Sequence, residues 1–321
     1  MRAVLPRAVK VETVPTDSGS DLILNGVPLD IEWVGEGWLR QVTPLLASRR
    51  NRPDVVVARR MSPGARDAMS TAGIGWIDET GAAEIAIGSM IVSRTGQPED
   101  PRKKPAGWTT SILAVAEALL CDTKPTVQAT VEATGLSTGS CTLALRFLTD
   151  HALLQARATR GRRSARRIVD VDRLLDRYAS AAAALRPSLH LRVGVTWKDI
   201  IAGLSRAGRI WEKTGVSWAA TAAAASQVVA PFITNVNAAE VYVGAKTVAE
   251  LQAVAARADL RPIEGGRLML LPFPTVTSER LARKADGLRI APWPRIYADL
   301  RTTGVRGEEA AEHLREVVRG R

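Results

Sequence analysis

The sequence predicts a mixed α/β (α+β) chain of several domains. Short apolar runs bounded by Gly, Pro and Asn alternate with apolar residues at helical spacing along most of the 321 residues. A tight Gly135-Leu136-Ser137 turn separates two helical patterns, and an arginine-rich segment follows them. We expect three domains: an endonuclease-like α/β domain at 1–100, a winged helix-turn-helix at 101–185 and a second α/β domain at 186–321.

The first domain is expected to begin with a hairpin. Asn25-Gly26, a strong hairpin signal, separates apolar strands at 21–24 and 27–33. Ser62 and Pro63 fit the cap and first position of a helix that ends near Gly73. The other expected elements are a helix at 38–46, a strand at 54–58, two strands at 74–87 around Thr80-Gly81, and a linker at 95–105.

A metal-dependent nuclease is the alternative for this domain. The strand–helix–strand order is compatible with an endonuclease core, whose site needs a carboxylate followed by Glu/Asp-x-Lys on the next strand. Here Asp78 precedes Glu84-Ile85-Ala86, and no lysine follows. We therefore expect a catalytically inactive domain in which Asp78 and Gly81 shape a turn.

The middle domain is expected to contain three helices, a strand, a loop, a second strand and a helix over 171–184. Ile112, Ala116, Leu119 and Leu120 share a face of the first helix, and Pro125 opens the second. Gly135 suits a left-handed helix stop, and Ser137 suits the cap of the third helix. The apolar positions expected to face inward on the third helix are Cys141, Ala144, Leu145 and Leu148.

This order predicts duplex DNA as the partner, because the second helix of a helix-turn-helix enters the major groove. The residues left on the outward side are Ser137, Thr138, Ser140, Thr142 and Arg146. Short hydroxyl side chains allow close approach, and an arginine can bond guanine O6 and N7. Capping of an ordinary helix is the alternative interpretation of Ser137 and Thr138.

The segment 157–167 holds six arginines and no acid, and it would form the wing. The arginines are Arg157, Arg160, Arg162, Arg163, Arg166 and Arg167. Guanidinium groups from this segment would hold the phosphate backbone or enter a narrow minor groove. The alternatives are a solvated basic loop and an RNA-binding arm.

The third domain should alternate strands and helices. Strands are expected at 189–195, 240–243 and 267–271, capping boxes at 196–199 and 247–250, and a final helix at 307–318. The box at 196–199 would start a helix with Ile200, Ile201, Leu204, Ala207, Ile210 and Trp211 on one side. Residues 216–239 carry no charge, but alanine and polar residues predict a buried helix and a loop instead of a membrane span.

A nucleotidyltransferase is the alternative for this domain. Its site needs a Gly-Ser turn followed by paired carboxylates. Gly215-Val216-Ser217 is followed by no acidic pair, and Glu240 and Asp299 stand apart. His151, His190 and His313 are scattered, and no phosphate-binding glycine motif occurs. We expect no enzyme activity, no cofactor and no metal.

Charge and cysteine content agree with a DNA-binding protein of the cytoplasm, associated with the nucleoid. The formal net charge is +11, and the positive excess follows residue 100. Cys121 and Cys141 offer neither metal spacing nor a disulfide framework, and the N-terminus lacks an apolar signal core. Oligomeric state is left open between monomer and homodimer.

Three features together resemble the AbiEi class of type IV toxin–antitoxin antitoxins. The first is Ala72-Gly-Ile-Gly-Trp-Ile-Asp-Glu-Thr-Gly-Ala-Ala83, with Ala82 where that family usually has Asn. The second is the central winged helix-turn-helix. The third runs from Ile296 (IYADLRTTGVRGEEAAEHLR), and the motif positions in it are Tyr297, Asp299, Arg306 and Glu309.

The resemblance implies a repressor of its own operon. The C-terminal domain would be a degenerate nucleotidyltransferase-like fold that supplies antitoxin activity. The functional partner would be a nucleotidyltransferase toxin, opposed without a stable protein complex. The alternatives are the metal-dependent nuclease and a DNA-organising or partner-binding module with low sequence specificity.

Overall fold

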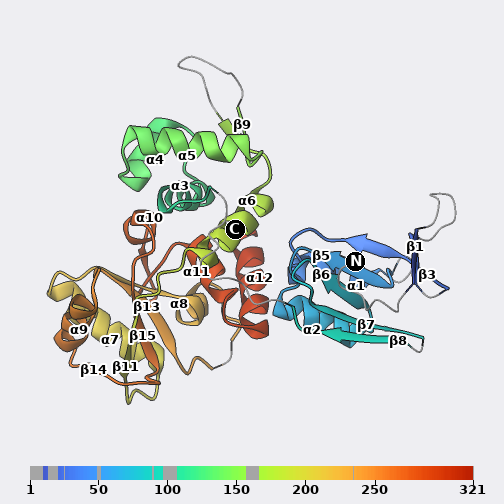
Figure 1. Ribbon diagram of the computed structural model, residues 1–321. Helices are drawn as coiled ribbons and strands as arrows, with labels where there is room; N and C mark the ends of the chain where they lie inside the picture. Colours follow the sequence, from blue (N-terminus) through green and yellow to red (C-terminus); the bar gives the residue numbers. More distant parts are fainter. Residues whose placement is uncertain are drawn as a thin grey trace. The chain divides into compact units, whose positions relative to one another are not determined.

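The structure is a computed structural model that describes residues 10–13, 21–24, 26–48, 52–88, 90–96, 107–156, 166–233 and 235–320. These ranges hold twelve helices and four sheets, which confirms the mixed α/β class (Figure 1). The chain divides into two compact units, Met1–Asp100 with Gly304–Glu309 and Pro101–Thr303 with Ala310–Arg321. No helix in the ranges just given is long and apolar enough to cross a membrane.

A five-stranded sheet of order β4-β5-β6-β7-β8 is the centre of the first unit. Its strands are β4 (Ile31–Trp33), β5 (Val55–Ala58), β6 (Gly75–Asp78), β7 (Ala83–Ile87) and β8 (Met90–Arg94). The first three are parallel and are joined by α1 (Leu39–Ala47) and α2 (Pro63–Ala72). Successive strand residues face opposite sides of a sheet. Accordingly, Val55 and Ile77 belong to one apolar cluster and Val56 and Trp76 to another, which includes the helices.

A three-stranded antiparallel sheet contributes to the first of these clusters. It consists of β1 (Val11–Thr13), β2 (Leu22–Leu24) and β3 (Val27–Leu29). The predicted strand 27–33 is wrong as a single element, because the chain changes sheets at Asp30, whose backbone N–H donates to Asp54 at 2.9 Å. Strand β8 was also not expected, and Asn25 of the predicted turn lies outside the described residues.

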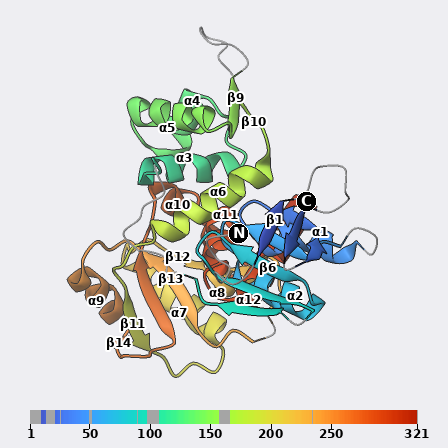
Figure 2. The same cartoon turned by 45° about the vertical axis from the view of Figure 1, so that its right-hand side comes forward.

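The second unit begins with the expected helices, hairpin and further helix. They are α3 (Thr110–Leu120), α4 (Val127–Thr134), α5 (Thr138–Asp150), β9 (Leu154–Ala156), β10 (Arg166–Ile168) and α6 (Val171–Ala184). Helix α3 packs against α4, α5, α6 and α10 (Val276–Arg280). Figure 2 shows the β9–β10 hairpin beside α5, in agreement with contacts between α5 and β9. Helix α3 is therefore the central support of this region.

A seven-stranded mixed sheet follows in the same unit, in the order β14-β11-β15-β13-β12-β17-β16. The strands are β11 (Leu191–Gly194), β12 (Trp218–Thr221), β13 (Ala239–Val243), β14 (Arg261–Pro262), β15 (Leu268–Pro272), β16 (Arg283–Ala285) and β17 (Leu288–Ile290). Helices α7 (Ile200–Lys213) and α9 (Val248–Arg257) cover one face (Figure 1). Helices α8 (Ala222–Val229) and α11 (Trp293–Leu300) cover the other. One apolar core runs from Trp108 to Leu314 through the helices and the sheet.

Local predictions in this region are partly corrected. The predicted capping box at 196–199 is wrong, because Asp199 itself caps α7 by accepting from the N–H groups of Ile201 and Ala202 at 2.9 and 3.0 Å. Ile210 is exposed and does not share the buried face of α7. The charge-free segment holds strand β12 before helix α8, and the final helix is α12 (Val305–Arg319).

Candidate nucleic-acid interface

The turn between α4 and α5 is built as the sequence predicts. Gly135 has a φ of 71° in the left-handed region, and its N–H donates to the Val131 carbonyl at 2.7 Å. The Ser137 hydroxyl accepts from the backbone N–H of Ser140 at 3.2 Å and so caps α5. Thr134 Oγ1 accepts from Leu136 N–H at 3.2 Å. These bonds fix the direction in which α5 leaves the turn.

The inner face of α5 consists of the four predicted residues, all of them buried. They are Cys141, Ala144, Leu145 and Leu148. They belong to the core that includes α3, and α5 packs against α3 and α4. Both helices of the turn therefore rest on α3, and the opposite face of α5 is left outward.

That outward face contains four of the five residues predicted for it in exposed positions. Ser137, Thr138, Thr142 and Arg146 are exposed, but Ser140 is half-buried and its hydroxyl accepts from Ser137 Oγ at 3.0 Å. The Thr142 hydroxyl donates to the Thr138 carbonyl at 2.8 Å and keeps its lone pairs as acceptors. Ser140 is thus the least accessible of the predicted base-reading residues.

The outward face also contains Gly139, Leu143 and Asp150, which the sequence interpretation did not select. At 100° per residue these three and Arg146 fall within an arc of roughly 60° opposite the buried row. A helical projection of 138–150 could have identified them. Arg146 Nε lies 3.7 Å from Asp150 Oδ2, and both side chains are exposed, so this pair is weak and easily exchanged.

The arginines predicted for the wing fall mostly outside the described residues, namely Arg157, Arg160, Arg162 and Arg163. Arg166 and Arg167 lie on β10, which pairs antiparallel with β9. Arg166 is half-buried, whereas Arg167 is exposed and donates to the Gln155 side chain at 2.6 and 2.9 Å. Arg167 is therefore the better placed of the two for contact with a phosphate.

Helix α10 holds α3 and α4 from the side of the large sheet. Thr277 Oγ1 donates to the carbonyl of Ala114 in α3 at 2.8 Å. Arg280 donates to the carbonyls of Glu132 and Ala133, at the C-terminal end of α4, at 3.2 and 3.3 Å. Cationic side chains suit helix C-termini because those carbonyls lack helical partners. Sequence reasoning did not identify α10, which is only five residues long.

The contact between α3 and α10, called the α3–α10 junction below, contains a buried carboxylate, Glu117 of α3. Its oxygens accept from Thr275 Oγ1 at 2.7 Å and from Ser278 Oγ at 2.7 and 3.0 Å. Burial raises the pKa of Glu117 to about 7, although the Arg295 guanidinium and the two hydroxyl donors act in the opposite direction. The stability of the α3–α10 junction should therefore change with pH near neutrality.

The C-terminal motif residues divide into two buried and two exposed positions. Tyr297 and Asp299 are buried in α11, and Arg306 and Glu309 are exposed near the start of α12. Glu308, which lies between Arg306 and Glu309, forms hydrogen bonds to two helices of the first unit. Its oxygens accept from Leu39 N–H at 3.0 Å and Gly64 N–H at 2.9 Å, in the first turns of α1 and α2.

Asp299 is held by hydrogen bonds from three elements. It accepts from Thr221 Oγ1 at 2.5 Å and from Tyr242 Oη at 2.7 Å, and it pairs with Arg295 one helical turn away. Burial acts to raise the pKa of Asp299, but the Arg295 guanidinium outweighs it and holds that pKa below the usual value. This carboxylate stays ionised as part of the core.

Ser217 and Glu240, which we considered for a nucleotidyltransferase site, are both bonded to other side chains of the protein. Ser217 Oγ donates to Glu279 at 2.6 Å, and Glu240 is paired with Arg186. Burial raises the pKa of Glu240, and Asp299 adds to the rise while Arg186 opposes it. Glu240 and Asp299 thus share one electrostatic environment, each held by an arginine. In the described part of the chain, no group of three or more His, Cys, Asp or Glu residues could hold a metal ion.

In the first unit, Asp78 is saturated by internal donors. Its Oδ2 accepts from Met61 N–H at 3.1 Å and from Arg66 Nη2 at 3.2 Å. Its Oδ1 accepts from Thr80 N–H at 3.0 Å, from the Thr80 hydroxyl and from Ala82 N–H at 3.2 Å. The geometry favours the turn-shaping role that the sequence predicts for Asp78.

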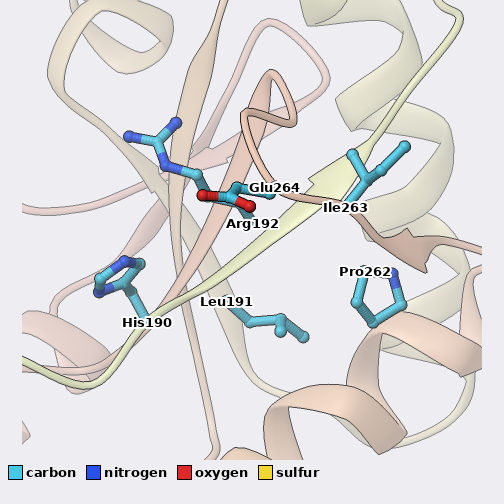
Figure 3. Close-up of a pocket in the computed structure, with 6 residues that line it drawn as sticks. All are labelled: His190, Leu191, Arg192, Pro262, Ile263 and Glu264. Carbon is cyan, nitrogen blue, oxygen red and sulfur yellow. The ribbon is translucent and has the colours of Figure 1, made fainter.

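A surface depression of about 370 Å³ lies at the β11–β14 edge of the large sheet. Its polar lining residues are His190, Arg192 and Glu264. Figure 3 shows His190 and Pro262 at opposite ends of it, and His190 Nδ1 contacts the Ser188 carbonyl at 2.9 Å. The polar groups do not converge on one point, so α5 remains the stronger candidate.

Comparison with family models, with curated proteins and with solved structures found no match for this chain.

Proposed function

We propose that this protein binds duplex DNA in a sequence-specific manner and acts as a transcriptional repressor. The observation that carries the proposal is the exposed face of α5, which follows a glycine turn and a serine cap and stands on a buried α3. Helices α3, α4 and α5 followed by β9 and β10 have the order of a winged helix-turn-helix. In that motif, the helix corresponding to α5 lies in the major groove.

Charge supports a nucleic-acid partner. The net charge of +11 includes the six arginines of 157–167, and the last of them, the exposed Arg167, lies on β10. We assign base reading to Thr138, Thr142 and Arg146, with a smaller part for Ser140, and phosphate contacts to the arginines of the wing. Four neutralised phosphates correspond to a slope of about −3.6 in log K against log salt concentration.

The first experiment selects duplexes from a random pool with the full chain and measures binding of the selected duplex by fluorescence anisotropy. A specific complex should exceed a scrambled duplex by about 10³ or more at physiological salt. Arg146→Ala should lose roughly 5- to 150-fold on the selected duplex, which corresponds to about 1–3 kcal/mol. Arg206→Ala, an exposed arginine of α7, is the matched control and should bind normally.

Equal binding of selected and scrambled duplexes would favour the DNA-organising or partner-binding alternative. Cleavage of plasmid in magnesium or manganese that is lost in Asp78→Ala would favour a nuclease. The saturated hydrogen bonding of Asp78 supports neither metal binding nor activation of water at that carboxylate.

We also propose that the repressor regulates its own toxin–antitoxin operon. The support is the similarity of the segment from Ile296 to the AbiEi antitoxin motif. In our interpretation the large mixed sheet is a nucleotidyltransferase-like framework without catalysis, in which Tyr297 and Asp299 build the core. The proposal predicts a nucleotidyltransferase gene beside the gene for this chain; expression of that gene alone should arrest growth, and co-expression of this chain should restore growth. Absence of such a gene, or of rescue, contradicts the antitoxin role and leaves DNA binding to be judged by the first experiment.

A further inference from the structure

Leu143 is an apolar side chain in the middle of a polar helix face. It is 67 % exposed, and among the large hydrophobic residues of the described ranges only Ile91 exceeds it. The four core positions of α5 are filled by other residues, so packing does not require a leucine here. Exposed leucines are common on protein surfaces, and the meaning of this one depends on its neighbours.

Gly139 lies one helical turn before Leu143 on the same outward row. A Cβ atom added to Gly139 would meet only Ser137 Oγ, at 3.9 Å, which is ordinary contact. Gly139 has no positive φ either, so the fold needs no glycine at this place. Glycine weakens a helix relative to alanine. At position 139 the absence of a side chain leaves the helix backbone accessible to a partner.

Arg146 follows Leu143 at the next turn, and Asp150, the last residue of α5, follows Arg146, so the first three positions of the row are Gly139, Leu143 and Arg146. The row thus combines a backbone open to close approach, a branched aliphatic group and a two-donor guanidinium. In the major groove the C5 methyl of thymine is an apolar group at a base edge, and guanine O6 and N7 suit an arginine. An aliphatic side chain followed by a guanidinium group therefore matches a thymine next to a guanine.

We propose that Leu143 reads the C5 methyl group of a thymine beside the guanine contacted by Arg146, and that Gly139 allows the helix to approach that base edge. This inference rests on the proposed function and specifies which base the helix prefers. A protein partner is disfavoured as the occupant, because Thr138, Thr142 and Arg146 surround Leu143 with polar groups. A stable protein interface needs an apolar centre far larger than one side chain.

The test replaces each thymine of the selected duplex by deoxyuridine, one at a time, which removes only the methyl group. With the wild-type chain one position should lose affinity by roughly fourfold, the value expected for burial of one methyl group. Leu143→Ala should bind the thymine duplex more weakly by a similar factor and should no longer distinguish thymine from uracil at that position. Ile210→Ala, an exposed aliphatic residue of α7, is the control and should keep the discrimination.

The outcomes separate the inference from the proposed function. A selected duplex that binds specifically but is insensitive to uracil at every position overturns the inference and leaves repression intact. Discrimination retained by Leu143→Ala overturns it as well. Failure to select any duplex contradicts both proposals. A second copy of this chain is the remaining candidate for contact with Leu143. Light scattering gives the molar mass of the same variants. If the wild-type chain is a dimer and Leu143→Ala is a monomer, Leu143 belongs to a contact between copies and the inference is overturned.

Discussion

Thr275 donates a hydrogen bond from Oγ1 to Oε2 of Glu117 at 2.7 Å, although the two residues are 158 positions apart in the chain. The bond joins α10 to α3, on which the helices of the turn rest. Ser278 adds a second hydroxyl donor to the same carboxylate. The candidate DNA-binding helices are therefore anchored on residues that precede β16 and β17 of the large sheet, and the two parts share one core.

The first prediction concerns pH. Burial raises the pKa of Glu117 from 4.5 to about 7, so the folded chain binds more protons than the unfolded chain between these values. The free energy of unfolding should consequently fall as pH rises through this window, by about 3 kcal/mol from this group. Glu117→Gln removes the titration, and its stability relative to wild type should rise between pH 5 and pH 8.

Urea unfolding followed by tryptophan fluorescence at the two pH values measures this difference. Glu132→Gln, at an exposed carboxylate of α4, is the control and should follow the wild-type pH dependence. An unchanged difference between Glu117→Gln and wild type across the range would show that the carboxylate titrates normally.

The second prediction concerns the buried pair of Arg295 and Asp299. Arg295→Met leaves the Asp299 carboxylate buried with only Thr221 and Tyr242 as donors, which should cost about 3–5 kcal/mol. The double variant Arg295→Met/Asp299→Asn should lose less than the sum of the single losses, because no unpaired charge remains. Urea unfolding of the four chains gives the coupling, and additive losses would argue against a structural role for this motif residue.

The third prediction concerns Asp78. Asp78→Ala removes the acceptor for three backbone N–H groups, those of Met61, Thr80 and Ala82, so it should destabilise the first unit by about 2–4 kcal/mol. Glu84→Ala, which loses only an exposed bond from Ser70, should change stability by less than about 0.5 kcal/mol. Similar stabilities of the two variants would contradict a structural role for the hydrogen bonds of Asp78.

The fourth prediction separates stability from binding at Gly139. Gly139→Ala should stabilise α5 by roughly 0.5–1 kcal/mol, because alanine loses less backbone freedom and the structure leaves room for its Cβ. Its affinity for the selected duplex should fall nevertheless, since the methyl group stands where the base edge approaches. Thermal unfolding and anisotropy on one preparation measure both quantities, and a variant that is more stable and binds equally well would contradict the close approach.

Elements with strong local signals were predicted well. Gly135, Ser137 and the spacing of Cys141 and Leu145 act within a few residues of each other, so the α4–α5 turn and the buried face of α5 follow from the sequence alone. The hairpin β2–β3 and helix α2 follow for the same reason. By contrast, the strand predicted over 27–33 failed, because its apolar residues serve two sheets and nothing local marks the change at Asp30.

Local sequence patterns were enough to predict the mixed α/β class, the helices of the central segment, the Gly135 stop and the Ser137 cap, since these depend on interactions within a turn or two of helix. The seven-stranded order, the hydrogen bonds of Asp299 with Thr221 and Tyr242, and those of Glu117 with Thr275 and Ser278 could be seen only in the folded chain. Those bonds join side chains from distant parts of the chain, and their strength comes from exclusion of water, which the folded core alone provides.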